Sequence, residues 1–251
     1  IRRTSARITI SLKDTPVRIG ALFVAIGSMS KTALLAGYTG LVGQALLRQL
    51  LERGDYSSIK ALGRRAPQVE QPTLQYLHSD MKSFKNLGDA LQADDAFCCL
   101  GTTIKAAGSR AAFERVDFHM VVEFARAAYE AGARRLFLVS SQSANPRAPF
   151  YYSRVKGRTE QAVNQIGFDC VHILRPSLLL GAREENRPGE RLAQSLAPAM
   201  NLLMRGPFKA YRAVTADEVA GALIKLATSD QADEGNFVHT LPLARACTAS
   251  S

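Results

Sequence analysis

Two groups of residues in this sequence have the types and spacing of a chemical site. The first is the turn Gly37–Gly43, which has glycines at positions 37, 40 and 43 and follows a short apolar run. Glycines at this spacing allow a tight strand-to-helix turn and let the backbone approach a pyrophosphate, which then lies at the helix N-terminus. The turn therefore predicts a dinucleotide site. Its expected contacts are Gly37, Thr39, Gly40, Leu41, Val42 and Gly43.

The charge that follows the second apolar run predicts which dinucleotide is bound. Sites selective for NAD place an Asp or Glu about 20 residues beyond the glycines, where it accepts from the ribose 2′-OH. This sequence has Arg64 and Arg65 there. A guanidinium instead favours a 2′-phosphate through charge-assisted hydrogen bonds. We therefore predict NADP(H), with solvation of both arginines in a loop as the less favoured interpretation.

The second group is Tyr152 and Lys156, with Ser140 and Ser141 upstream. Residues i and i+4 share one helix face, and an adjacent ammonium lowers the pKa of a tyrosine. Tyr152 could then transfer a proton while hydride passes between nicotinamide and a carbonyl carbon, and Lys156 could also donate to ribose hydroxyls. One serine could polarise the carbonyl. Strand alternation allows only one of the two to face the site, and we favour Ser141. Tyr151 is a weaker alternative to Tyr152, because it is five positions from Lys156.

Further contacts are expected where other strands end, since ligands of open parallel sheets lie at the carboxyl ends of the strands. The stretch 78–81 follows the expected third strand, where a short acid could meet the adenine amino group. The stretch 100–103 follows the fourth, where the backbone could line the middle of the cofactor. These predicted contacts are Asp80, Met81, Leu100, Gly101, Thr102 and Thr103.

Alternating strands and helices must position these residues. Such alternation requires right-handed crossovers and gives a parallel sheet with helices on both faces. We predict an α/β fold with a doubly wound parallel sheet, the Rossmann fold. Residues 29–251 would form one domain, in which 180–213 break the rhythm with prolines and glycine and make a small C-terminal extension on the substrate side. The patterns predict strands at 32–36, 59–63, 74–77, 96–100, 135–139 and 169–174, and helices at 41–53, 110–131, 151–166 and 215–228.

Composition excludes several classes of protein. With 251 residues, 47% of them hydrophobic and 22% charged, the chain can bury one large core. No run of 18 apolar residues occurs, so we expect no spanning helix and no membrane partner. The four cysteines lack C-x-x-C and zinc-ligand spacing, which favours reduced thiols, no metal and a cytoplasmic location.

A formal charge of +10 with a pI near 9.7 could suggest nucleic acid as a partner. However, residues 1–28 contain five basic residues and one acid, and so supply +4 of this charge. The stretch superficially resembles a transit peptide, but Met29 stands just before the first strand, and we interpret 1–28 as upstream sequence without a function. Because an aromatic-basic motif is also missing, nucleic-acid binding is not expected.

Taken together, these motifs resemble the short-chain dehydrogenase/reductase superfamily, in particular the atypical branch that includes the Tat-interacting-protein oxidoreductase homologues. The resemblance covers about residues 31–192. It implies that Ser141, Tyr152 and Lys156 are the catalytic set, that Pro176 and Ser177 lead into the nicotinamide wall, and that a homodimer could form through the long helices. The distinctive stretches are Phe97–Thr103, Arg115–Asp117, Tyr152–Gly157 and Arg187–Glu190.

One departure from the superfamily pattern affects proton transfer. Many members hold a relay water with an asparagine on the long helix, whereas this sequence has Asp117 and no asparagine between Arg110 and Gly132. The relay is therefore in doubt. We predict an NADP-dependent oxidoreductase acting on a small or medium carbonyl or alcohol. Two alternatives stay open: an NADPH-binding, redox-sensing regulator with a protein partner and little turnover, and an epimerase or dehydratase that uses the cofactor transiently.

Overall fold

The computed structural model describes residues 31–180, 213–229 and 234–241. Within these ranges, seven parallel strands form one sheet in the order β3-β2-β1-β4-β5-β6-β9. The predictions for 1–28, for 181–212 and for the Arg187–Glu190 stretch lie outside the described residues. The strands of the sheet are β1 (Thr32–Ala36), β2 (Ser58–Gly63), β3 (Leu74–His78), β4 (Asp95–Cys98), β5 (Arg135–Val139), β6 (Cys170–Pro176) and β9 (Gly235–Leu241).

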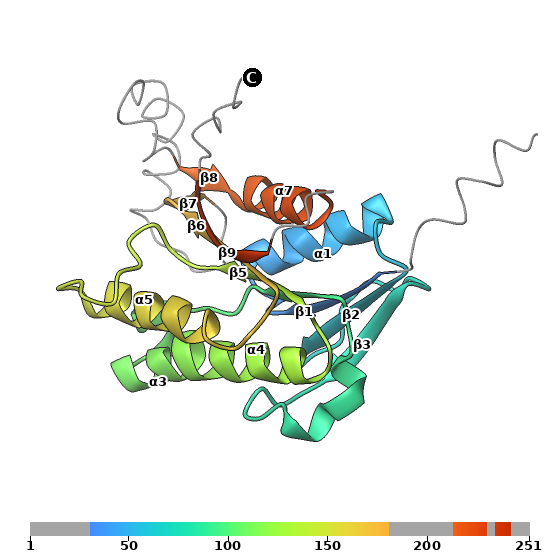
Figure 1. The fold of residues 1–251 in the computed structure, drawn as a ribbon, viewed down its shortest axis with the longest axis horizontal. Helices are drawn as coiled ribbons and strands as arrows, with labels where there is room; N and C mark the ends of the chain where they lie inside the picture. Colours follow the sequence, from blue (N-terminus) through green and yellow to red (C-terminus); the bar gives the residue numbers. More distant parts are fainter. Residues whose placement is uncertain (1–30, 181–212, 230–233, 242–251) are drawn as a thin grey trace, which may run out of the picture.

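Helices cover both faces of the sheet, as the alternation predicted. The helices α1 (Leu41–Arg53) and α7 (Ala216–Ala227) lie on one face, and α4 (Val121–Glu130) and α5 (Tyr151–Val163) lie on the other (Figure 1). Both faces of the central strands are consequently buried: Leu34 of β1 packs into the core under α4, and the next residue, Leu35, packs into the core under α1 and α7. The doubly wound fold is confirmed.

Local signals define the two helices on the first face. Helix α1 ends at Gly54, which has φ 68° and takes the left-handed conformation that favours glycine. Helix α7 begins with a capping box, in which Thr215 Oγ1 accepts from Glu218 N at 3.1 Å and a Glu218 carboxylate oxygen accepts from Thr215 N at 2.8 Å. None of the described helices is long and apolar enough to cross a membrane.

The order of the strands indicates at which edge of the sheet a ligand would bind. From β1 the chain continues outward through β2 and β3, and it then crosses to β4 on the other side of β1. The point between β1 and β4 is therefore the topological switch point, where the carboxyl ends of strands border a crevice in open α/β sheets. The glycine turn follows β1, and the loop that contains Leu100–Thr103 follows β4, so both lie at this point.

The long helix expected at 110–131 is interrupted. It consists of α3 (Arg110–Glu114), a π-helical segment η3 (Arg115–Met120) and α4, and the short helix α2 (Ile104–Ala107) precedes it. Hydrophobic spacing cannot detect the extra residue in such a turn, because the apolar face continues on either side. π-Helical turns inside α-helices are frequent at functional sites.

Other differences lie near the sheet edges. Strand β4 ends at Cys98, two residues earlier than predicted, so Leu100 belongs to the loop. Strand β9 was not predicted, because it is an edge strand whose residues are mostly exposed or half-buried. A 3-10 segment, η2 (Lys85–Leu91), was also missed. The short strands β7 (Leu179–Leu180) and β8 (Val214–Thr215) pair in parallel, one at each end of the predicted substrate-side extension.

Candidate functional site

The glycine turn has a geometry that glycine alone satisfies at two of its positions. Gly37 has φ +84°, and a Cβ built there would lie 2.5 Å from the carbonyl carbon of Cys99. A Cβ at Gly43 would lie 2.1 Å from the oxygen of Gly37. At Gly40 the space is only tight, with 3.3 Å to the same oxygen. Gly37 and Gly43 thus let the turn fold against β4 and against the first turn of α1.

The N-terminus of α1 is open to an anion. Gly40 is its N-cap, no side chain caps it, and no acidic residue stands in the first turn. The positive end of the helix and its first backbone N–H groups are therefore not neutralised by a carboxylate from the helix itself. Together with the glycine turn, this end fits the pyrophosphate of a dinucleotide.

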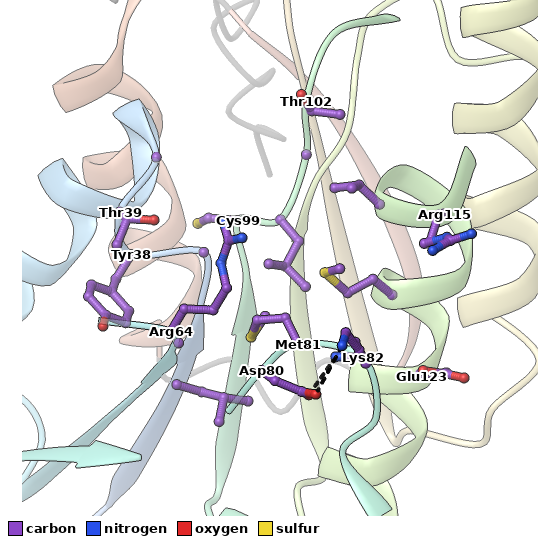
Figure 2. A pocket seen from close by; sticks show the side chains of 18 of the residues that line it. Tyr38, Thr39, Arg64, Asp80, Met81, Lys82, Cys99, Thr102, Arg115 and Glu123 are labelled. Carbon is purple, nitrogen blue, oxygen red and sulfur yellow. Dashed lines mark hydrogen bonds and ion pairs between the residues drawn. The ribbon is translucent and has the colours of Figure 1, made fainter. Parts of the chain in front are cut away.

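A cavity of about 930 Å³ opens at this edge of the sheet (Figure 2). We call it the glycine-turn cavity. It brings together predicted contacts that follow four strands, β1 to β4: Gly37, Thr39, Gly40, Arg64, Asp80, Met81, Leu100, Gly101 and Thr102.

Several residues that line this cavity were not predicted. In Figure 2, Arg115 and Glu123 lie across the cavity from Arg64, on η3 and α4. His119 of η3 and Cys99 also line it. Arg115 belongs to the stretch that carried the family resemblance, but only the path of η3 brings it to the cavity. Of the predicted cofactor contacts, Leu41, Val42, Gly43, Arg65, Thr103, Lys156, Pro176 and Ser177 are not among the described residues that line it.

The two neighbouring arginines line different cavities. Arg64 lines the glycine-turn cavity, and Arg65 lines a second cavity of about 860 Å³ beside α1. Tyr38 lines both cavities and accounts for the separation: its hydroxyl donates to the carbonyl oxygen of Arg65, and a Cβ at Gly63 would lie 2.7 Å from its ring. Arg64 is therefore the cation of this pair that can meet a group bound in the glycine-turn cavity.

Asp80 and Met81 line the cavity and lie beside each other in Figure 2. Asp80 Oδ1 accepts from the backbone N–H of Lys82 at 2.9 Å, and the Lys82 ammonium lies 4.0 Å from the other carboxylate oxygen. Met81 has φ 62°, a left-handed conformation that is uncommon for a residue with a side chain. The N–H of Met81 donates to Ser79 Oγ at 3.0 Å, which supports this turn.

The two serines after β5 have different partners. Ser140 is buried, and its hydroxyl donates to Glu160, which also pairs with Arg175. Ser141 is half-buried, and its Oγ lies 3.2 Å from Ser143 Oγ at the surface. The Ser140 hydroxyl is therefore part of a buried hydrogen-bond network with Glu160. The Ser141 hydroxyl lies outside that network, just after the end of β5.

The two tyrosines at the start of α5 also differ. The Tyr151 hydroxyl donates to Glu114 at 2.6 Å, and Glu114 pairs with Arg158 at 2.7 Å. Tyr152 instead stacks on Phe113, with ring centroids 5.4 Å apart. Tyr152, after Asp117, is among the groups that raise the pKa of Lys156 against the effect of burial.

Lys156 is buried and paired with Asp117. Its ammonium lies 2.7 Å from Asp117 Oδ1, and the side chains are 8% and 0% exposed. The second carboxylate oxygen accepts from the backbone N–H of Thr102 at 2.8 Å. Burial alone would lower the pKa of Lys156, but the charges of Asp117 and Tyr152 outweigh it and raise that pKa. Lys156 is thus an ammonium at neutral pH.

Comparison with known proteins identifies the family. Residues 37–230 match the family described as NAD(P)H-binding. The chain belongs to this family. Protein HTATIP2 of Rattus norvegicus is 35% identical over 169 residues, which are 66% of this chain and 69% of that protein. "Protein fmp52, mitochondrial" of Aspergillus niger is 36% identical over 203 residues, 78% of this chain and 86% of that protein. The predicted atypical short-chain dehydrogenase/reductase branch is thereby confirmed.

Solved structures share the fold of this chain at low sequence identity. MoeE5 in complex with UDP-glucose and NAD superimposes with a TM-score of 0.63 at 20% identity, covering 83% of this chain and 75% of that one. A short chain dehydrogenase family protein from Francisella tularensis gives 0.57 at 15% identity, with coverage of 83% and 96%. These likenesses confirm the Rossmann-type arrangement.

Proposed function

We propose that this NAD(P)H-binding protein is an NADP-dependent oxidoreductase that reduces a small or medium carbonyl compound or oxidises the corresponding alcohol. One observation carries the proposal: the glycine-turn cavity, which we take as the site of the nicotinamide dinucleotide, is lined by the exposed cation Arg64 just after β2. A guanidinium at that position favours a ribose 2′-phosphate over a free 2′-OH.

The charges around the cavity support NADP(H) over NAD(H). The carboxylate that would accept from a ribose 2′-OH is missing at the end of β2, where Gly63 leads directly to Arg64. Asp80 and Glu123 are the acids among the described lining residues, and Asp80 has Lys82 beside it. Arg64, Lys82 and Arg115 therefore outnumber the two acids among the described lining residues, and a dianionic phosphate next to Arg64 would be attracted overall.

Three side chains outside the glycine-turn cavity would carry the proton chemistry. Tyr152 would donate a proton to the substrate oxygen during reduction, or accept it during oxidation. Lys156, held as an ammonium, would favour the phenolate form of Tyr152. The Ser141 hydroxyl would donate to the same substrate oxygen. Bound NADP(H) would supply or accept the hydride.

Turnover by the wild-type protein and by Tyr152→Phe tests the enzymatic part of this proposal. Tyr151→Phe is the matched control, because it removes a neighbouring hydroxyl whose partner is Glu114. With a panel of carbonyl compounds and alcohols, Tyr152→Phe should lose activity about 100-fold or more, and Tyr151→Phe should lose much less. Equal activities of wild type and Tyr152→Phe would refute the assignment. Substrate conversion without net NADPH consumption would instead indicate an epimerase or dehydratase.

A second candidate function is a redox-sensing regulator that binds NADPH with little turnover. The Asp117–Lys156 pair favours it, because a carboxylate at 2.7 Å offsets the charge that would activate Tyr152. This function requires that NADPH binding change the affinity for a protein partner. Partner capture that is the same with and without NADPH, and the same for Arg64→Ala, would exclude it.

The cellular location stays a prediction. The cysteine pattern favours the cytoplasm, whereas the relative from Aspergillus niger is named as mitochondrial. We propose the cytoplasm on the basis of the reduced thiols Cys98, Cys99 and Cys170, none of which forms a disulfide among the described residues. Fractionation of cells that express the full chain, probed against markers of both compartments, tests this. Recovery in the mitochondrial fraction would overturn it.

A further inference from the structure

A buried ion pair lies directly behind the wall of the glycine-turn cavity. The pair is Lys156 and Asp117, and Gly101 is the wall residue in front of it. A Cβ at Gly101 would lie 3.3 Å from Asp117 Oδ1 and 3.4 Å from the Lys156 ammonium. Because Asp117 also accepts from the N–H of Thr102, its carboxylate joins the catalytic-set lysine to the backbone that lines the cavity.

The π-helical segment brings Asp117 to this place. Asp117 is the third residue of η3 and is fully buried. Its backbone carbonyl accepts from Thr159 Oγ1 of α5 at 2.7 Å, and Thr159 is buried as well. Helix α5 therefore holds Asp117 twice, through Thr159 at the backbone and through Lys156 at the carboxylate. A water-mediated contact is not needed to connect η3 with Lys156.

We propose that Asp117 is a positioning residue that clamps Lys156 to the Thr102 backbone and offsets part of the lysine's charge beside Tyr152. The inference rests on the proposed function in that Tyr152 is taken as the proton-transfer group. The clamp itself belongs to the nucleotide-free protein, so it can be tested without turnover.

The charges that face Lys156 come from three elements: Asp117 from η3, Tyr152 from α5 and Cys98 from β4. Burial raises the pKa of Cys98 to about 12, so its thiol is neutral at neutral pH. The Phe113 ring that covers Tyr152 has no charge. With Asp117 ionised, the net charge of the pair is zero. With a neutral residue at position 117, burial lowers the pKa of Lys156, and the charge that the lysine keeps is unbalanced. A neutral residue there should therefore stabilise the phenolate of Tyr152 further.

Titration of Tyr152 in the nucleotide-free protein measures this charge. The ultraviolet absorbance of tyrosinate is followed against pH in each protein, and the same curve from its Tyr152→Phe counterpart is subtracted. Asp117→Asn should lower the pKa of Tyr152 by about one pH unit or more, because an unbalanced cation remains. Lys156→Met should raise it, since Asp117 then stands alone. In the double variant Asp117→Asn/Lys156→Met, the pKa of Tyr152 should lie between those of the two single variants.

Glu130→Gln is the control, because it removes the same charge from an exposed position of α4. A shift for Asp117→Asn that is no larger than the shift for Glu130→Gln would overturn the proposal, whatever happens to thermal stability. If Asp117→Asn does not fold, the double variant is compared with Lys156→Met, and it must titrate at the lower pH. Loss of turnover without any shift would also contradict the clamp. A shift without turnover in any variant would contradict the proposed enzyme but support the clamp.

Discussion

Arg64 and Arg65 are adjacent in the sequence but contribute to different surfaces. The sequence limited the candidates for a 2′-phosphate ligand to these two residues, because they follow an apolar run at the expected distance from the glycines. It could not choose between them. The choice depends on Tyr38, whose hydroxyl holds the carbonyl of Arg65 and whose ring packs against Gly63. Such a contact between two loops has no signature in local spacing.

Ser141 and Tyr152 illustrate the same limit. Spacing favoured Tyr152 over Tyr151 because of its distance from Lys156, and the partners of Tyr151 agree with that preference. For Ser140 and Ser141, the alternation of side chains along a strand predicted only that one of the two would face the site. The hydroxyl of Ser140 is used by Glu160, a residue on a helix that is distant in sequence. The catalytic roles of Ser141, Tyr152 and Lys156 stay predictions.

Removing the cation of the buried Asp117–Lys156 pair should lower the free energy of unfolding by an amount that depends on pH. Lys156→Met leaves Asp117 buried without its partner, and breaking such a pair costs about 3–5 kcal/mol. The pKa of Lys156 is raised in the folded state above its ordinary 10.5. The contribution of the pair is thus complete below pH 10.5 and is lost as the pH rises through the folded-state pKa. Urea unfolding measures the free energy of unfolding of wild type and Lys156→Met at neutral pH and above pH 10.5. The difference between the two proteins should be large at neutral pH and smaller at the higher pH.

Lys105→Met is the control for this measurement, because Lys105 is exposed on α2 and its loss should change the free energy of unfolding by less than about 0.5 kcal/mol. An equal cost for both variants, or a cost for Lys156→Met that does not change with pH, would contradict the account of the pair.

At the scale of elements, the glycine turn was predictable and the π-helical segment was not. Strand, turn and helix each have a local signal, so the bounds of α1 agree with the prediction. The segment η3 lies within a continuous amphipathic pattern, and the backbone carbonyl of Asp117 in it accepts from Thr159 of another helix. Asp117 was noticed in the sequence only because the related pattern has asparagine there. Its pairing with Lys156 depends on how η3 and α5 pack.

The glycine turn predicts a graded effect of adding a single methyl group. Gly43→Ala would place a Cβ 2.1 Å from the Gly37 oxygen, so the turn must move and the backbone groups at the start of α1 lose their arrangement. We expect NADPH affinity to fall about tenfold or more. Gly40→Ala is the matched control, since its Cβ has 3.3 Å to the same atom and Gly40 has φ −80°, which any residue adopts.

Isothermal calorimetry on the folded variants, with circular dichroism to verify the fold, separates the two effects. Equal NADPH affinities for Gly43→Ala and Gly40→Ala would show that close packing at the turn does not govern binding.

For the whole molecule, topology explains why distant stretches form one site. The carboxyl ends of β1, β2, β3 and β4 converge on the glycine-turn cavity, so contacts from Gly37 to Thr102 meet there. The alternation of apolar runs made this edge predictable. Strand β9 was not predictable, because an edge strand with exposed residues lacks a buried pattern. The predicted small-molecule substrate and homodimer stay predictions.

The affinities of the wild-type protein, Arg64→Ala and Arg65→Ala for NADPH and for NADH measure how the protein distinguishes the two cofactors. We expect the wild type to bind NADPH at least about tenfold more tightly than NADH, since one charge-assisted contact to the 2′-phosphate contributes about 1.5–3 kcal/mol. Arg64→Ala should remove most of this preference and leave NADH affinity nearly unchanged, while Arg65→Ala should keep the preference. Equal binding of NADPH and NADH by the wild type, or a preference that survives Arg64→Ala, would contradict the proposed role of Arg64.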